Sequence, residues 1–429
     1  MIKITDELRN RWLESYKEKK LRKKAYLHFD PPISPDKAVI FATNPYEVTS
    51  HSFYPFIHWI EETPRYKKDE EGLRHMNLKK RDLYKAAHAD SAIFSWYAFI
   101  LEQCYEQKVC DSKINDVVIA YRTLRKSSYD FANEAFTFIQ IAEKPISAMC
   151  YDIESFFDRL DHGLLLEKCT AILGRPLLED ELFVLNQVTK FNFVKDEDTN
   201  VIKDFKDRYR LCSPSQFRTQ IGDNNLIQKN EKIYGIAQGT PISAILSNIY
   251  LFDFDKEISR ETKNRNALYR RYSDDILLAC KNDDSTFFEK LVLTQIDKMK
   301  LQIQKAKTVT TMFKEAPDGK VICVDINGSP SRIQYLGLEF DGENIFIRSS
   351  TIARNYRRTK TAAHSHKKLQ EKSNKKISKK KLFYKYTHLG NNNFYSYIRR
   401  VEKATSNSKS RKQMKKHVAI LKNEINKGN

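Results

Sequence analysis

Hydrophobic and polar positions divide the first third of the chain into segments of different period. A charged helix followed by a proline-containing stretch is expected within residues 1–30. Residues 61–81 are nearly all polar and indicate an exposed hairpin or loop. Residues 83–106 carry apolar side chains at helical spacing, including Leu83 and Ala87, so we predict a helix there.

Short apolar segments dominate from residue 144 onward. Residues 148–153 predict a buried strand that ends in acidic side chains, and residues 160–173 predict a helix. Residues 241–259 indicate a long buried helix that follows a glycine turn.

Two further strand patterns and a basic region complete the chain. Residues 268–280 predict two strands joined by a tight acidic turn, and residues 333–340 predict a strand, a glycine and a second strand. From residue 350 the pattern is helical and basic, with Tyr and Phe interleaved.

Charge is concentrated at one end of the 429-residue chain. The net charge is +20, from 75 Lys and Arg against 55 Asp and Glu. Residues 351–429 hold 23 of the basic residues and 3 of the acidic ones, which leaves 52 of each for residues 1–350. Such a surface favours a polyanionic partner, because Lys and Arg neutralise phosphates and release counterions. A solvated basic tail is the equally weighted alternative.

Composition excludes several classes of protein. With 41% hydrophobic and 12% aromatic residues, the chain can bury a sizeable core. The seven cysteines form no CxxC pair, so reduced thiols in a cytoplasmic protein are expected. No signal peptide and no run of 18 apolar residues is visible, so no membrane partner is expected.

Two acidic segments end apolar stretches and suggest a metal centre. Asp152 follows the first stretch, and Asp274 and Asp275 lie in the turn of the second. Carboxylates flanked this closely by apolar residues are costly to desolvate unless they are paired or metal-bound. Two Mg²⁺ ions, with Mn²⁺ as a substitute, would neutralise them and support phosphoryl transfer. A single Asp-Asp pair is more often a solvated turn, so the two segments carry weight only together.

Five segments in order resemble the palm of reverse transcriptases, over residues 144–340. They are residues 151–162 (YDIESFFDRLDH), 235–251 (GIAQGTPISAILSNIYL), 272–275 (YSDD), 301–308 (LQIQKAKT) and 335–340 (YLGLEF). The N-terminal segments around His51 and Ala87-His88-Ala89-Asp90, with Ala120-Tyr121-Arg122, resemble the bacterial defence-associated (abortive-infection and unknown-group) or retron-type members.

The resemblance implies roles for named residues. Asp152, Asp274, Asp275 and the backbone carbonyl of Ile153 would face the metals. Phe157 would pack under the sugar and exclude a 2′-hydroxyl. Other residues would line the nucleotide or hold the primer; they are Gln238, Gly239 and Lys307 for the nucleotide, and Leu336 and Gly337 for the primer.

Structural interpretations of these residues remain open. Phe157 could be plain core, Lys307 a surface residue and Gly337 a site of strand bending. The basic fingers segment that usually covers the triphosphate is not obvious in the sequence. Lys79-Lys80-Arg81 and residues 120–126 are candidates, of which Arg122 is preferred, with a solvated loop as the alternative.

We therefore predict an α+β right-hand polymerase. Residues 1–143 would form an N-terminal extension and fingers, 144–345 the palm with a fingers-like insertion near 175–232, and 346–429 a basic helical thumb. The expected reaction is DNA synthesis from dNTPs on an RNA template. A dedicated noncoding RNA partner and a role in anti-phage defence are further expectations.

Two alternatives remain open at this stage. One is untemplated or protein-primed DNA synthesis by the same site, and the 22 tyrosines offer no way to choose a priming hydroxyl. The other is a non-enzymatic RNA-binding scaffold derived from a polymerase, against which the three intact aspartates argue. The sequence assigns no oligomeric state.

Overall fold

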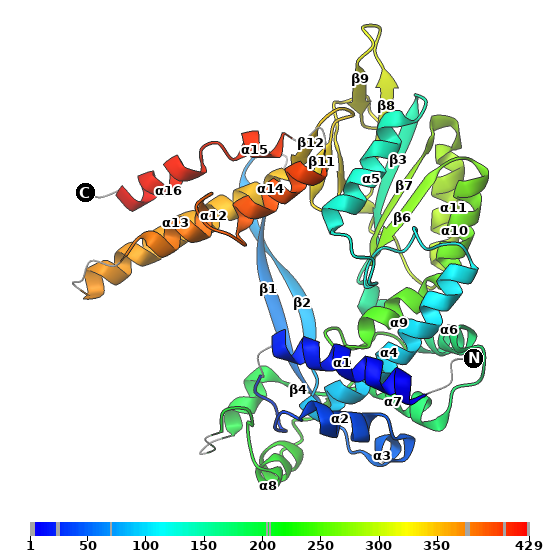
Figure 1. Cartoon of the computed structure of the whole chain (residues 1–429), viewed down its shortest axis with the longest axis vertical. Coiled ribbons are helices and arrows are strands. Elements are labelled where there is room, and N and C mark those ends of the chain that lie inside the picture. The colour runs from blue at the N-terminus through cyan, green and yellow to red at the C-terminus, as the bar shows by residue number, and fades with distance from the viewer. Residues whose placement is uncertain are drawn as a thin grey trace. The chain divides into compact units, whose positions relative to one another are not determined.

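The computed structural model describes residues 5–22, 26–68, 71–202, 205, 207–373, 378–405 and 409–426. Contacts divide the chain into two compact units, each assembled from separate stretches of sequence (Figure 1). Unit 1 comprises residues 1–115, 153–257 and 294–302, and unit 2 comprises 116–152, 258–293 and 303–429. These units cross the boundaries of the three predicted parts, whose division at residues 143 and 345 stays a prediction. The predicted α+β class is confirmed.

Unit 1 combines helices with a sheet of strand order β2-β1-β4-β5. Its strands are β1 (Phe56–Lys68), β2 (Arg74–Lys85), β4 (Asn192–Lys195) and β5 (Gln228–Lys229). Its helices include α1 (Asp6–Arg22), α2 (Pro35–Ala42), α3 (Pro45–Ser50), α4 (His88–Asp111), α6 (His162–Leu173), α7 (Glu179–Thr189), α8 (Pro214–Gln216) and α9 (Ser243–Tyr250).

The polar segment at residues 61–81 forms the outer part of an antiparallel ribbon. Strands β1 and β2 pair from Ile57 with Lys85 to Lys68 with Arg74, and Figure 1 shows them as a long two-stranded arm. The predicted helix over 83–106 begins later than expected, because Leu83 pairs with Trp59 in the ribbon and α4 starts only at His88. The carboxylate of Asp30 accepts hydrogen bonds from the backbone N–H groups of His88 and Ala89, and so fixes that start.

The helix predicted over residues 241–259 is in fact two helices. Helix α9 ends at Tyr250, and α10 (Phe252–Asn264) begins after Leu251, whose backbone has left the helical geometry. The hydroxyl of Tyr250 donates to the Met299 carbonyl at 2.7 Å. Tertiary contacts of this kind are not visible in a continuous apolar pattern, which is why the sequence suggested one helix.

Unit 2 contains a five-stranded antiparallel sheet of order β6-β7-β3-β8-β9. The strands are β3 (Ile146–Asp152), β6 (Leu268–Tyr272), β7 (Asp275–Lys281), β8 (Val309–Glu315) and β9 (Val321–Val324). Figure 1 shows α5 (Ser128–Ile141) on one side of this sheet, with α10 and α11 (Ser285–Lys298) on the other. Both faces of β3 and β7 are therefore covered, which accounts for their nearly uninterrupted apolar sequence.

A smaller sheet joins the main sheet to the C-terminal helices. Strands β10 (Ile333–Tyr335), β11 (Leu338–Phe340) and β12 (Ile345–Ile347) form it, and Phe340 stacks on Phe136 of α5 at 5.0 Å between ring centroids. The C-terminal helices are α12 (Ser349–Ser373), α13 (Lys380–Tyr386), α14 (Phe394–Ala404), α15 (Ser410–Gln413) and α16 (His417–Asn426).

The C-terminal helices are not a loose basic tail. Ile398, Val401 and Met414 are buried in the same core as Phe136 and Phe340. The side chain of Gln413 also bonds to both the N–H and the carbonyl of Ile347. Burial of this kind, rather than charge, holds the region to the rest of unit 2.

Candidate nucleotidyl-transfer site

The three predicted catalytic aspartates all lie in unit 2, at one end of its main sheet. Asp152 is the last residue of β3, and in the antiparallel register it pairs directly with Asp275, the first residue of β7. Asp274 occupies the two-residue turn between β6 and β7, where Tyr272 pairs with Asp275. The register therefore brings together carboxylates that are more than 120 residues apart in sequence.

Like charges directly opposite one another on neighbouring strands destabilise a sheet. Desolvation, together with the negative charges of Asp274 and Asp152, raises the pKa of the Asp275 carboxyl to about 6. A cation at this end of the sheet would relieve both effects.

Lys307 supplies one such cation. Its ammonium contacts the carboxylate of Asp152, lying 2.9 Å from Oδ2 and also donating to Oδ1. The backbone positions it, because the N–H of Gln304 donates to the carbonyl of Asp152 at 2.8 Å, and the short helical turn Lys305–Lys307 follows. The sequence motif around residues 301–308 is thus joined to the first acidic segment, which leaves Lys307 near the acidic centre rather than on a remote surface.

The donor set suits a hard cation, since carboxylate oxygens are the ligands that Mg²⁺ prefers. In the side-chain arrangement of the described residues, no group of three or more His, Cys, Asp or Glu side chains is gathered closely enough to hold a metal ion. Asp152, Asp275 and Asp274 fit a metal site by chemistry and by backbone placement. Side-chain rotation, including release of Asp152 by Lys307, would be needed to complete the ligand set.

Arg271 contacts the acidic turn and was not singled out by the sequence analysis. It is fully buried, and its Nη1 donates to the carbonyl of Ser273 in the turn at 3.1 Å. A buried arginine needs partners for its charge, and here one of them is the backbone of the acidic turn. The signal in the sequence was an arginine pair, Arg270-Arg271, inside an otherwise strand-like apolar segment.

The predicted primer-holding residues form a turn in unit 2. Leu336 and Gly337 both have positive φ, 46° and 84°, and connect β10 to β11. The carbonyl of Gly337 accepts the N–H of Arg348 at 3.1 Å. A Cβ at Gly337 would meet no atom within 4 Å, so glycine is favoured at this position by its positive φ and not by close packing.

Arg122, the preferred fingers cation, also belongs to unit 2. Its Nη1 donates to the Val118 carbonyl of its own loop at 2.8 Å. The other candidates lie on β2 in unit 1, where Lys80 and Arg81 face Glu62 and Glu61 at 3.4 Å across the ribbon. The choice among these basic residues stays a prediction.

Phe157, Gln238 and Gly239 belong to unit 1. The carbonyl of Phe157 accepts the N–H of Ile236 at 3.0 Å, so the first and second sequence motifs are joined there. The Phe157 ring is half-buried and lies 5.5 Å from the buried ring of Phe156. Ile153, also in unit 1, is buried next to Asp152 in the chain.

The structure explains why residue 239 is glycine, which the sequence did not reveal. The N–H of Tyr84 donates to the carbonyl of Gln238 at 2.8 Å, which ties the motif to strand β2. With φ at +111°, a Cβ on residue 239 would lie only 2.8 Å from the Tyr84 carbonyl oxygen. Glycine is therefore required at position 239 by a close approach of two backbone segments within unit 1.

We expect Gly239→Ala to lower the melting temperature more than Gly319→Ala does. Both residues have positive φ, but a Cβ at Gly319 meets nothing within 4 Å, so only Gly239 adds a collision with backbone. A strained φ costs about 1–3 kcal/mol, and the collision adds to that cost. Thermal unfolding followed by circular dichroism measures the difference, and equal melting temperatures would show that the Tyr84 contact imposes no constraint.

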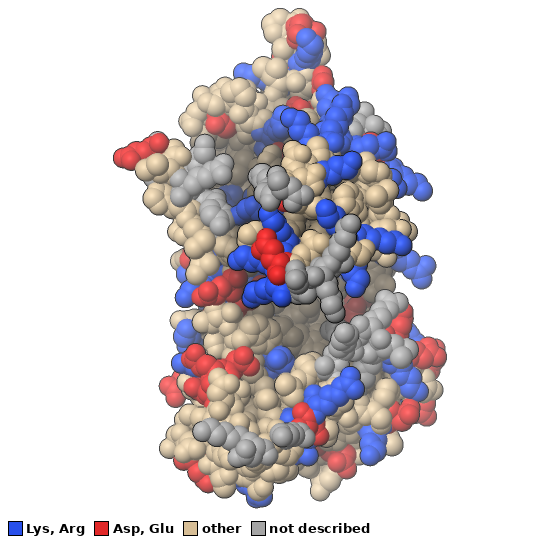
Figure 2. Space-filling view, turned by 90° about the vertical axis from the view of Figure 1, so that its left-hand side faces the viewer, with Lys and Arg blue, Asp and Glu red and all other residues tan. Residues whose placement is uncertain are grey.

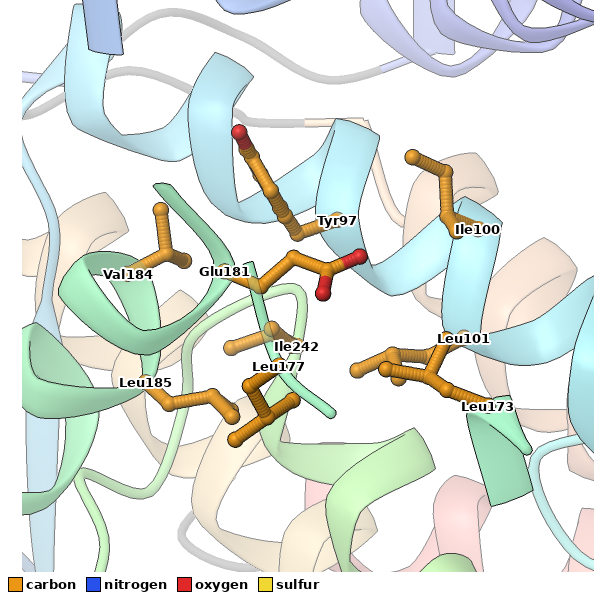
Figure 3. Close-up of a pocket in the computed structure, with 9 residues that line it drawn as sticks. All are labelled: Tyr97, Ile100, Leu101, Leu173, Leu177, Glu181, Val184, Leu185 and Ile242. Carbon is orange, nitrogen blue, oxygen red and sulfur yellow. The ribbon is translucent and has the colours of Figure 1, made fainter. Parts of the chain in front are cut away.

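The described residues of unit 1 line two cavities of very different size. A small apolar cavity of about 10 Å³ lies between α4 and α7, with the Glu181 and Tyr97 side chains among its lining (Figure 3). It has room for at most one water molecule. A wider, open hollow of about 700 Å³ lies at the start of α6 and is bordered by Lys190, Lys229 and Lys232.

An antiparallel sheet with acidic residues at the β6-β7 turn and at the end of β3, joined to a lysine-bearing segment, is typical of a polymerase palm. Residues 100–340 match the family model described as "Reverse transcriptase (RNA-dependent DNA polymerase)", which covers more than half of the chain. The chain belongs to the reverse-transcriptase family.

Comparison with solved structures finds telomerases. Apo telomerase from Candida tropicalis, truncated from its C-terminal domain, is 12% identical, with a TM-score of 0.41 over 78% of this chain and 58% of that one. Telomerase from Candida albicans with a fragment of telomeric RNA is 12% identical, with a TM-score of 0.41 over 82% of this chain and 54% of that one. The chain thus spans little more than half the length of either. Among curated proteins, none matches.

Proposed function

We propose that the protein synthesises DNA from dNTPs on an RNA template, by phosphoryl transfer at two divalent cations held by Asp152, Asp274 and Asp275. The observation that carries this proposal is the pairing of Asp152 with Asp275 across β3 and β7, with Asp274 in the adjoining turn. When bound, such cations activate the attacking 3′-hydroxyl and stabilise the leaving group. Mg²⁺ fits this oxygen-only donor set, and Mn²⁺ would substitute.

The chain's own residues would perform the remaining tasks. Lys307 would move from Asp152 toward the incoming triphosphate, as a cation or a proton donor. Phe157 would exclude a ribose 2′-hydroxyl, which favours dNTPs over rNTPs. Leu336 and Gly337 would hold the primer end, and Gln238, Gly239 and Arg122 would contact the nucleotide.

A nucleic-acid surface on the C-terminal helices supports an RNA partner. Figure 2 shows Lys and Arg side chains crowded on the face drawn there, and exposed basic residues recur along α12 and α14. In the described residues of this region, Glu424 and Glu402 pair with Lys360 and Arg411. Most of the excess positive charge is thus available for phosphates, and a dedicated noncoding RNA is the partner we propose.

A role in bacterial anti-phage defence, in the cytoplasm, completes the proposal. It is supported by the resemblance of the His51, Asp90 and Tyr121 segments to defence-associated or retron-type enzymes. His51 Nε2 lies 2.7 Å from the buried carboxylate of Asp90, so the first two of these segments meet in unit 1. All seven cysteines are free thiols, which fits a reducing compartment. Within the described residues, no helix combines the length and apolarity of a membrane span.

Nucleotide incorporation by the purified protein with its copurifying RNA, Mg²⁺ and labelled nucleotides tests the reaction. We expect a DNA product complementary to one bound RNA, with dNTPs used in preference to rNTPs. Sequencing of the product separates the alternatives. A homopolymer or random sequence would instead establish untemplated synthesis, and a product covalently attached to the protein would establish protein priming. Absence of any product with supplied primer and template would favour the RNA-binding scaffold.

A further inference from the structure

The acidic turn between β6 and β7 has a backbone that needs support. Ser273, the residue before Asp274, has φ at 59°, in the left-handed region that glycine normally occupies. A non-glycine residue in such a conformation costs about 1–3 kcal/mol and persists where its surroundings fix it. Since Ser273 precedes both aspartates of the turn, whatever fixes it also fixes their positions.

Two contacts converge on Ser273 from within unit 2. The buried guanidinium of Arg271 donates a hydrogen bond to the Ser273 carbonyl. The Ser273 hydroxyl shares a hydrogen bond of 3.2 Å with the hydroxyl of Tyr121. Ser273 itself is only 4% exposed, so its side chain cannot exchange this partner freely for water.

The loop that presents Tyr121 is built onto the edge strand of the sheet. The N–H of Arg271 donates to the Val117 carbonyl at 2.8 Å, and the N–H of Ile119 donates to the Arg271 carbonyl at 3.0 Å. Residues 117–120 are all buried. The chain then turns sharply at Tyr121, which has φ at 61°.

Packing does not explain the position of Tyr121. The residue is 46% exposed, whereas the four residues before it are each at most 3% exposed. A tyrosine held at a strained backbone angle with its ring half in solvent gains little from burial. The Tyr121 side chain instead reaches the acidic turn, through the hydrogen bond of its hydroxyl.

We propose that Tyr121 is a positioning residue for the catalytic turn. Its hydroxyl fixes Ser273, and through Ser273 it holds Asp274 and Asp275 in the geometry that binds divalent cations. This inference rests on the proposed function in one respect, that these carboxylates take cations. It assigns to residues 117–121 a role in preorganising the site, separate from any contact with the nucleotide.

The test compares Tyr121→Phe and Ser273→Ala, which remove the two sides of the hydroxyl bond. Mn²⁺ binding, measured by electron paramagnetic resonance on the whole chain, needs no polymerisation. Loss of a residue that orients metal ligands costs about 10–100-fold in metal affinity or activity. We expect Mn²⁺ affinity to fall about tenfold in each variant, with an unchanged melting temperature. Because the two residues act through one bond, the double variant should bind no more weakly than either single one.

Tyr46→Phe provides the matched control, because Tyr46 is a 76% exposed tyrosine on α3 in unit 1. In incorporation assays, the Mg²⁺ concentration for half-maximal rate should rise in the Tyr121 and Ser273 variants, while KM for dNTP stays close to wild type. Wild-type Mn²⁺ affinity in both variants would overturn the positioning role, even if the wild-type enzyme polymerises. A wild-type protein that binds Mn²⁺ and makes no DNA would overturn the proposed function alone. A wild-type protein that binds no Mn²⁺ would overturn both.

Discussion

Replacing Asp274 and Asp275 together by alanine is expected to reduce nucleotide incorporation on the order of 10³-fold or more, while RNA binding stays nearly intact. Cations at such a site supply several kcal/mol of transition-state stabilisation, and each 1.36 kcal/mol or so is a factor of ten in rate. In the double variant Asp152 is the one of the three carboxylates that remains, and Lys307 already pairs with it. Too little negative charge is then left to bind divalent cations. Incorporation of labelled dNTPs measures the first effect, and filter binding of RNA measures the second.

A matched control is available in the turn that follows strand β7. Asp283 and Asp284 form a second adjacent pair, after the far end of β7, and Asp284 pairs with Arg265 at the surface. Alanine at both positions should leave incorporation near the wild-type rate, because an exposed ion pair contributes little. Retained synthesis in the Asp274 and Asp275 variant would remove these residues from the proposed metal site. A parallel loss of RNA binding would mean that the variant is misfolded or that the turn binds RNA directly.

The second large effect concerns salt. Replacing four exposed basic residues of the C-terminal region, three on α12 and one between α15 and α16, by glutamine should flatten the dependence of RNA affinity on salt concentration. The substitutions are Arg354→Gln, Arg358→Gln, Lys368→Gln and Lys415→Gln. Each lost contact with a phosphate lowers the slope of log K against log salt by about 0.7–0.9. If all four contact RNA, the slope falls by about 3.

Substitution is the sharper experiment because truncation would damage the core. Ile398, Val401 and Met414 share a core with Phe340, so removal of the last fifth of the chain would expose apolar surface in unit 2. The control replaces four exposed lysines elsewhere by glutamine; they are Lys37, Lys256, Lys290 and Lys298. An unchanged slope in the C-terminal variant, or an equal change in the control, would place the RNA surface elsewhere.

The sequence was most informative where local pattern and chemistry coincide. Strands β3, β6, β7, β10 and β11 and helix α6 occur where the apolar periodicity predicted them, because strand and helix faces impose their own period on buried residues. Asp152, Asp274 and Asp275 could be selected because ionisable residues inside apolar stretches are costly without partners. The family assignment followed from the order of these segments.

Contacts between distant segments were beyond the reach of that reasoning. The apolar run across residues 241–259 concealed the break at Leu251, because periodicity does not reveal where a backbone turns. Gly239 was predicted to line the nucleotide, whereas the neighbour that excludes a side chain at this position is the Tyr84 carbonyl. Leu83 fitted a helical face but pairs with Trp59 in the ribbon, since strand pairing overrides local propensity.

By itself the sequence determined the α+β class, the acidic segments, the lysine that follows them and the concentration of charge after residue 350. These properties are encoded by residue type and spacing, which act locally. The tertiary structure alone decided that Asp152 faces Asp275, that Lys307 reaches Asp152, and that Tyr121 holds Ser273. Each of these depends on strand register and on loops closed across more than a hundred residues, and register is set by the packing of the whole sheet.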